Sequence, residues 1–193
     1  MWTVKRQLAV WMVTALSLLQ AGCRAAKLDV DLPDPGVDAG LPDCPVGYRL
    51  QNAYLGTAFS LQLTRKVDRP FEYTPVVAPS DEFDWATALW DLEPAGSEGA
   101  ETYRLRNFAL DQYLVHSIEI QEGADGEDRV WSLKPVESPY EKGQPLFALL
   151  PYPGLGEALG TTTHPPYQLR MLTGDARPDQ HWRLSAYRNC AMD

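Results

Sequence analysis

The chain has 193 residues and carries 26 acidic against 17 basic side chains, for a formal net charge of −9 at pH 7. A surface with this excess of negative charge repels phosphate backbones, so the composition argues against nucleic-acid binding. The sequence contains no H-E-x-x-H, G-x-S-x-G or glycine-rich phosphate-loop motif, and its histidines are scattered. We therefore expect neither an enzyme nor a protein that holds a metal or cofactor.

The first residues have the pattern of an export signal. Lys5 and Arg6 precede an uncharged apolar run over 8–19, and small residues precede Cys23. An apolar run of this length is too short to cross a membrane as a mature helix and is typical of a signal peptide that is removed. Residues 19–23, Leu-Gln-Ala-Gly-Cys, also resemble the bacterial lipobox, whose cysteine is lipidated and becomes the new N-terminus.

This resemblance implies a lipoprotein signal peptide over 1–22 and lipidation of Cys23. It also implies attachment to the bacterial cell envelope, at the outer membrane or the cell surface. The lipobox usually has Leu, Val or Ile three residues before its cysteine, and this chain has Gln20 there. The alternative is an ordinary secretory signal that is cut nearby, after which the protein is secreted and Cys23 has no role.

Residues 23–43 are rich in aspartate and proline and nearly free of aromatic side chains. Such a segment cannot bury enough apolar area to offset the entropy lost on ordering, so we expect a solvated tether. The aspartates do not match an EF-hand calcium loop. Counted from Asp29, the fifth position is Pro33, and the sixth, where the loop needs glycine, is Asp34.

From residue 44 onward the sequence contains three copies of one pattern. Each copy ends in a Trp-x-Leu segment, and these segments begin at Trp90, Trp131 and Trp182. Each copy opens with an aromatic-x-Leu segment, and these are Tyr48–Leu50, Tyr103–Leu105 and Phe147–Leu149. Repetition at this spacing indicates that the copies share one core, because a single copy cannot bury its own apolar face.

Within each copy, short apolar runs alternate with Gly, Pro, Asp and Ser and show no sustained helical period. We predict four short strands per copy. They cover 48–51, 58–63, 74–78 and 88–92 in the first, 103–106, 112–116, 117–121 and 129–133 in the second, and 146–150, 157–161, 167–172 and 181–186 in the third. The leucines of the opening segments and the three tryptophans should fill the core.

The three copies, the all-β pattern and the Gln180-His181-Trp182 motif together resemble the ricin-type β-trefoil, the fold of the ricin B-chain lectin family. The resemblance covers 44–190, with Ala88 and Arg129 at the positions of Gln180 in the first two copies. It implies one all-β domain in which a six-stranded barrel is capped by three hairpins, with approximate threefold symmetry.

The resemblance also bears on Cys44 and Cys190, which lie at the two ends of this region. The first and last strands of a trefoil are neighbours, and export would place the protein in an oxidising compartment. The resemblance therefore implies a disulfide between these two cysteines. Two free, buried thiols are the alternative.

Sugar binding is the activity that the resemblance implies. Ricin-type repeats use an Asp just after the Leu of the second strand to accept hydrogen bonds from sugar hydroxyls, while an aromatic ring stacks on the sugar. Counting from Asn52 and Asn107, we place Ser60, Val115 and Gly160 at this position, and none of them is a carboxylate.

The remaining candidates for ligand contact are Asp84 and Trp85 in the first copy and Tyr113 and His116 in the second. An indole beside a carboxylate suits a sugar, although Trp85 could instead cap the barrel. Two functions stay open. The chain is either a lectin-like, lipid-anchored protein that binds glycan or another cell-surface molecule, or a structural or protein-interaction lipoprotein that retains only the fold. In both cases we expect a monomer.

Overall fold

The computed structural model describes residues 46–79, 85–96, 101–137, 145–154 and 156–188. The side chains of 85, 86 and 188 are outside this description. The predicted signal peptide, the tether and all three cysteines also lie outside the described residues. Lipidation of Cys23 and the Cys44–Cys190 disulfide therefore stay predictions. No helix among the described residues is long and apolar enough to cross a membrane.

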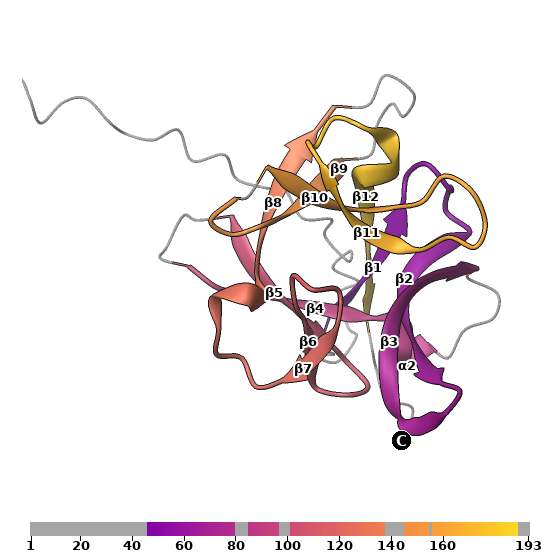
Figure 1. The fold of residues 1–193 in the computed structure, drawn as a ribbon. Helices are drawn as coiled ribbons and strands as arrows, with labels where there is room; N and C mark the ends of the chain where they lie inside the picture. Colours follow the sequence, from indigo (N-terminus) through magenta and orange to yellow (C-terminus); the bar gives the residue numbers. More distant parts are fainter. Residues whose placement is uncertain (1–45, 80–84, 97–100, 138–144, 155, 189–193) are drawn as a thin grey trace, which may run out of the picture.

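Twelve strands account for most of the described chain (Figure 1). They are β1 (Val46–Asn52), β2 (Phe59–Lys66), β3 (Arg69–Pro79), β4 (Trp90–Pro94), β5 (Thr102–Asn107), β6 (Gln112–Leu114), β7 (Ile120–Glu122), β8 (Val130–Val136), β9 (Leu146–Pro151), β10 (Glu157–Thr161), β11 (Leu169–Thr173) and β12 (His181–Arg188). Three short helical turns precede the tryptophan strands: α2 (Trp85–Ala88), η2 (Glu127–Arg129) and η3 (Pro178–Gln180). Every predicted strand is present, so the all-β prediction is confirmed.

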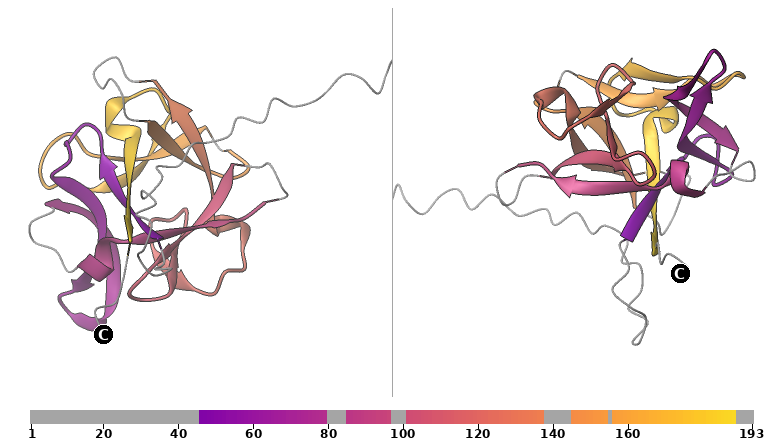
Figure 2. Two further views of the ribbon diagram at one scale, coloured as in Figure 1. Left: turned by 180° about the vertical axis from the view of Figure 1, so that it is seen from behind. Right: turned by 90° about the horizontal axis from the view of Figure 1, so that it is seen from below.

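Six of these strands close into a barrel. The antiparallel pairs run β1–β12–β9–β8–β5–β4, and β4 returns to β1 through the pair Tyr48↔Trp90. The other six strands form the hairpins β2–β3, β6–β7 and β10–β11. The hairpins lie toward one end of the barrel, and the chain enters β1 and leaves β12 at the other end (Figure 2). This arrangement is the β-trefoil that the sequence predicts.

The two repeated motifs meet each other at equivalent points of the barrel. The leucine of each Trp-x-Leu segment lies directly opposite the leucine of an aromatic-x-Leu segment. The three pairs are Leu92↔Leu105, Leu133↔Leu149 and Leu184↔Leu50. Because successive side chains of a strand point to opposite faces, one short motif per strand is enough to fix both register and facing.

The core contains every residue that the repeats assign to it. Trp90, Trp131 and Trp182 have no exposed surface, and Leu50, Leu105 and Leu149 are buried equally completely. These residues join one apolar cluster with the leucines of the hairpins. His181, which alternates with Trp182, is outside that cluster. It is buried, and its Nε2 donates to the carbonyl oxygen of Asp175 at 2.9 Å.

Candidate ligand-binding hollows

Among the surface hollows beside the hairpins, two occupy equivalent places in their repeats. The third-repeat hollow, of about 450 Å³, is formed by the end of β10, the β10–β11 loop, β11 and the turn at η3. Its lining includes Thr161, Thr162, Thr163, His164, Arg170, Arg177 and Asp179. The first-repeat hollow, of about 440 Å³, is formed by β2, β3 and α2, and its lining includes Gln62, Leu63, Thr64, Arg65, Tyr73, Val76 and Thr87. Both volumes fall within the range of small-molecule sites.

The two hollows occupy the same place in their repeats. The indole nitrogen of Trp90 donates to the carbonyl oxygen of Leu61 at 3.1 Å, and that of Trp182 donates to the carbonyl oxygen of Leu159 at 2.8 Å. These contacts align the two repeats residue by residue. On this alignment Thr87 matches Asp179, because each lies three residues before its tryptophan.

Cross-strand partners extend the equivalence to the far wall of each hollow. Gln62 pairs with Val76 in the first repeat, and Gly160 pairs with Arg170 in the third. Val76 and Arg170 therefore stand at matching positions and line matching hollows. The two hollows have the same backbone frame and different side chains.

In the second repeat an arginine stands at the position of Gln180. Trp131 keeps the indole contact, with its Nε1 donating to the carbonyl oxygen of Leu114 at 3.0 Å. Arg129, two residues before it, reaches across to the β6–β7 hairpin. Its guanidinium donates to the Gln121 side chain at 2.8 Å and to the carbonyl oxygens of Glu122 and Asp125. Arg129 thus ties the hairpin to the turn.

Gln180 makes the same connection in the third repeat. This side chain is fully buried, and its Nε2 donates to the carbonyl oxygens of Leu172 and Gly174, both at 2.8 Å. Its Oε1 accepts from the backbone N–H of Arg177 at 3.2 Å. The Gln of the Gln-x-Trp motif therefore holds the third hairpin in place and contributes to the fold.

The alignment corrects one residue of the sequence prediction. The position just after the second-strand leucine is Gln62 in the first repeat, and Ser60 lies before that leucine. Val115 and Gly160 keep the positions predicted for them. A Cβ atom at 160 would lie 2.7 Å from Leu172 Cδ1 and 3.0 Å from the carbonyl oxygen of Asp179, so a larger residue there would have to displace these neighbours. None of these three positions holds a carboxylate.

A carboxylate reaches the third-repeat hollow from another position. Asp179 has only 3% of its side chain exposed, and Arg177 closes over it with two hydrogen bonds. Arg177 Nε donates to Oδ1 at 3.0 Å, and Nη2 donates to Oδ2 at 2.7 Å. Such a two-point pair fixes the plane of the guanidinium. Neither Arg177 nor Asp179 was predicted from the sequence as a site residue. The sequence feature that could have identified them is their position shortly before the Gln180-His181-Trp182 motif.

The first-copy candidates are only partly within the described chain. Asp84 lies outside it. Trp85 begins α2, and its side chain is not described. Thr87, two residues later on the same helix, lines the first-repeat hollow. The structure therefore puts this helix at the hollow and leaves ligand contact by Trp85 and Asp84 a prediction.

The second-copy candidates have partners within the fold. Tyr113 is buried, and its hydroxyl donates to Glu93 at 3.0 Å. Burial, followed by this bond to Glu93, raises the pKa of the Tyr113 hydroxyl. His116 Nε2 donates to the carbonyl oxygen of Val130 at 2.8 Å, and its ring meets Trp131 edge-on. Neither residue lines the first- or third-repeat hollow.

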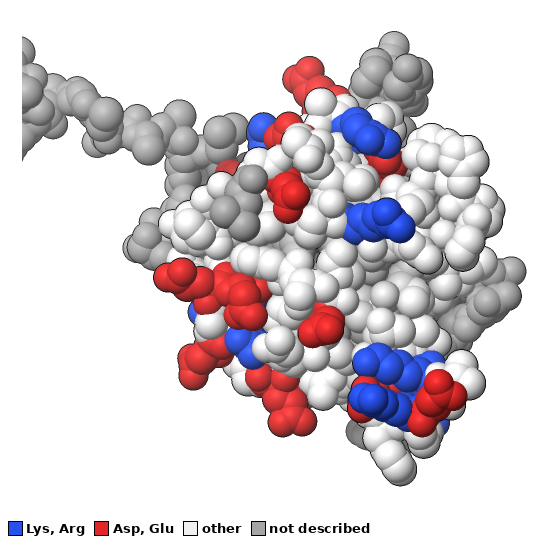
Figure 3. Space-filling view, in the orientation of Figure 1, with Lys and Arg blue, Asp and Glu red and all other residues white. Residues whose placement is uncertain are grey.

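Charge is distributed unevenly over the surface. In the view of Figure 3, acidic side chains gather at the lower left and groups of both signs occupy the lower right. Asp111 belongs to an ion-pair cluster in the second repeat, in which Arg106 also contacts Asp91 and Glu93.

Within the described part of the chain, no group of three or more His, Cys, Asp or Glu side chains is arranged to hold a metal ion.

No family model matches the chain, and no curated protein matches it. Solved β-trefoil structures do. BEL beta-trefoil matches with a TM-score of 0.55 and 13% identity, over 77% of this chain and 98% of that one. SeviL bound to asialo-GM1 saccharide matches with a TM-score of 0.51 and 14% identity, over 76% and 99%. The Haemophilus ducreyi cytolethal distending toxin matches with a TM-score of 0.56 and 17% identity, over 79% and 89%. At these identities the matches establish the fold.

Proposed function

We propose that this chain is an exported, lipid-anchored protein of the bacterial cell envelope whose β-trefoil binds glycan. The observation that carries the binding proposal is the pair of equivalent hollows in the first and third repeats. A monosaccharide is amphipathic, and sites for it combine apolar walls with a few fixed hydrogen-bonding groups. The third-repeat hollow supplies threonine hydroxyls, His164, two arginines and the apolar side chain of Leu172.

The likeness to SeviL supports this proposal at the level of fold, since that protein is bound to a saccharide. Affinity for a single sugar should be modest. Because Gln62, Val115 and Gly160 replace the sugar-reading carboxylate, a charged acceptor worth about 1.5–3 kcal/mol is missing from each repeat. Binding in the first-repeat hollow would then depend on stacking by Trp85 with help from Asp84.

The same substitutions favour a second candidate function. A trefoil without the sugar-reading Asp in any repeat could serve as a protein-interaction or structural module at the cell surface. A glycan array probed with a chain that lacks residues 1–23 separates the two functions. Reproducible signals from related glycans, reduced in Trp85→Ala for any ligand of the first repeat, support the lectin-like function. An array without signal supports the interaction module.

Anchoring needs its own experiment, because it depends on residues outside the described structure. Cys23→Ser should leave the precursor uncleaved and unlabelled by a radioactive or alkyne-tagged fatty acid in the bacterial host. Normal processing of that variant would indicate an ordinary secretory signal and a released protein.

A further inference from the structure

The third-repeat hollow differs from the first-repeat hollow in its charged side chains. Of the described residues that line it, Arg170 and Arg177 are the permanent cations and Asp179 is the carboxylate. The chain as a whole carries a net charge of −9. A local excess of positive charge in an acidic protein attracts an anionic group to that place in preference to the surrounding surface.

The carboxylate in this hollow is already engaged. Both oxygens of Asp179 accept from Arg177, and only 3% of the aspartate side chain is exposed, against 59% of the arginine side chain. A ligand therefore meets the guanidinium rather than the carboxylate. Asp179 holds the guanidinium in one orientation, which lowers the entropy lost when that group binds an acceptor.

Arg170 adds a second guanidinium to the lining of the hollow. It extends from β11 next to Gly160, and its Nη2 donates to the side chain of Gln168 at 3.1 Å. Asp175, the other carboxylate of the neighbouring turn, is paired with Lys134. Asp175 therefore does not neutralise the hollow, whose two arginines and one aspartate leave one excess positive charge.

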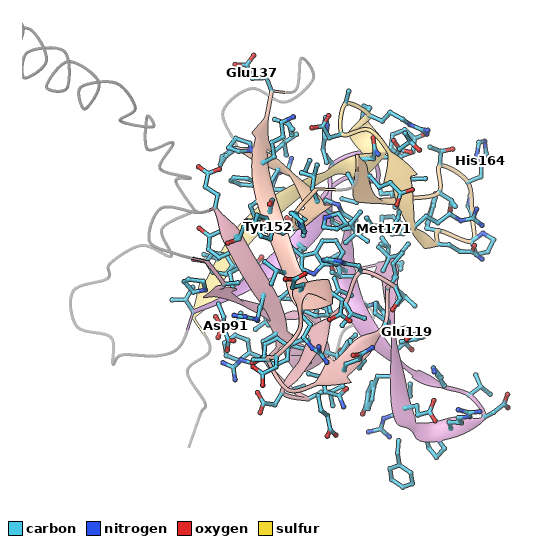
Figure 4. All side chains as sticks on the ribbon, turned by 60° about the vertical axis from the view of Figure 1, so that its left-hand side comes forward. Asp91, Glu119, Glu137, Tyr152, His164 and Met171 are labelled. Atoms are coloured by element: carbon cyan, nitrogen blue, oxygen red, sulfur yellow. The ribbon has the colours of Figure 1, made fainter. Side chains whose placement is uncertain are left out.

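The loop that borders the hollow adds neutral hydrogen-bonding groups. Thr162 Oγ1 accepts from the backbone N–H of Gln168 at 2.9 Å, which holds the loop in shape. Thr163 Oγ1 lies 3.0 Å from Nδ1 of His164. His164 lies at the outer end of this loop and extends away from the barrel (Figure 4). Hydroxyl and imidazole groups can read sugar hydroxyls while the arginines hold an anion.

The first-repeat hollow provides an internal comparison. Val76 stands at the position of Arg170, and Thr87 at that of Asp179. Its own arginine, Arg65, donates to the hydroxyl of Tyr73 at 2.9 Å and lies over the same ring. The arranged pair of guanidinium groups is thus a property of the third repeat and not of the fold.

We propose that the third-repeat hollow selects an acidic saccharide, one that carries a carboxylate or a sulfate. The anion would sit between Arg170 and Arg177, and the ring hydroxyls would face Thr163 and His164. Guanidinium groups match both anions because each offers oxygen pairs in a geometry that accepts two parallel hydrogen bonds. This assignment rests on the proposed glycan binding and specifies the ligand class for one of the two hollows.

The test is a calorimetric titration of the chain lacking residues 1–23 with lactose, 3′-sialyllactose and 3′-sulfolactose. We expect an acidic sugar to bind about tenfold more tightly than lactose, and this preference to shrink as salt is added. The two acidic probes distinguish a carboxylate site from a sulfate site. Arg170→Gln should remove most of the preference, and Arg170→Lys should retain part of it.

Arg69→Gln is the matched control, since it removes the same charge from the exposed β2–β3 hairpin and should leave the preference unchanged. Circular dichroism should show that the variants fold.

If lactose and the acidic sugars bind equally, the acidic class is wrong while glycan binding stands. If Arg170→Gln keeps the full preference, the anion is bound elsewhere and this placement is wrong. If none of the three probes binds while other neutral glycans score on the array, the acidic class is again wrong. An array without any signal would mean that glycan binding, the proposed function itself, is wrong.

Discussion

The indole nitrogen of Trp182 donates a 2.8 Å hydrogen bond to the carbonyl oxygen of Leu159 in the core of the trefoil. Trp90 and Trp131 make the same bond to Leu61 and Leu114. Each bond joins a barrel strand to the first strand of a hairpin. The tryptophans therefore do more than fill the core, since they also attach the three hairpins to the barrel.

Trp182→Phe should destabilise the protein by about 1–3 kcal/mol, because it leaves the buried carbonyl oxygen of Leu159 without its donor. Trp90→Phe and Trp131→Phe should have similar costs if the three bonds are equivalent. Urea unfolding followed by circular dichroism measures each change. A cost below about 0.5 kcal/mol at all three sites would show that the indole nitrogen contributes only packing.

Gln180→Ala should cost about 1–3 kcal/mol, since it removes the donor for the carbonyl oxygens at the end of β11. The exposed Gln168 is a suitable control, and Gln168→Ala should change the free energy of unfolding by about 0.5 kcal/mol or less. Equal costs for the two variants would mean that Gln180 does not hold the hairpin.

Tyr113 should make stability depend on alkaline pH. Burial and the bond to Glu93 raise the pKa of its hydroxyl in the folded state, so the neutral form is favoured there. Its contribution is present below the unfolded value of about 10 and is lost as pH rises through the raised folded pKa. Tyr113→Phe should therefore flatten the decline of the unfolding free energy above pH ~10. An unchanged slope would assign the decline to other groups, among them Tyr103, whose pKa burial also raises.

The Cys44–Cys190 disulfide is consistent with the register of the terminal strands. The last described pair of β1 and β12 is Val46↔Arg188, two residues inside each cysteine. Peptide mapping without reductant should recover one linked peptide from the exported protein. Reduction should lower stability, by at most about 4–5 kcal/mol for a loop of this length in the chain-entropy model. Two alkylatable thiols at these positions would rule the bond out.

The barrel could be predicted from the sequence because its information is local. Leu105, for example, belongs to a three-residue motif, and its partner Leu92 belongs to the other motif, so pattern and register agree. The hollows could not be predicted in this way. Counting from Asn52 selected Ser60 instead of Gln62, because the segment from Asn52 to Leu61 is longer than its counterpart in the second copy.

The remaining parts of the site depend on contacts that no motif encodes. Arg129 connects the β6–β7 hairpin to the turn before Trp131 only because its guanidinium meets Gln121 and the carbonyl oxygens of the hairpin. Asp179 orients a guanidinium group in the third-repeat hollow only because Arg177 pairs with it. These pairings depend on the conformation of the turns before Trp131 and Trp182, and a sequence motif does not specify that conformation.

Glycan binding in an equivalent pair of hollows is tested most directly by nuclear magnetic resonance. The backbone amide signals of the chain lacking residues 1–23 would be recorded during titration with a glycan that scores on the array. We expect concentration-dependent shifts at the third-repeat hollow, centred on Thr161, Thr163 and Arg170, or at Gln62 and Thr87 in the first repeat, with the second repeat unaffected. Saturating shifts confined to the second repeat, or no shifts at all with any scoring glycan, would contradict the account.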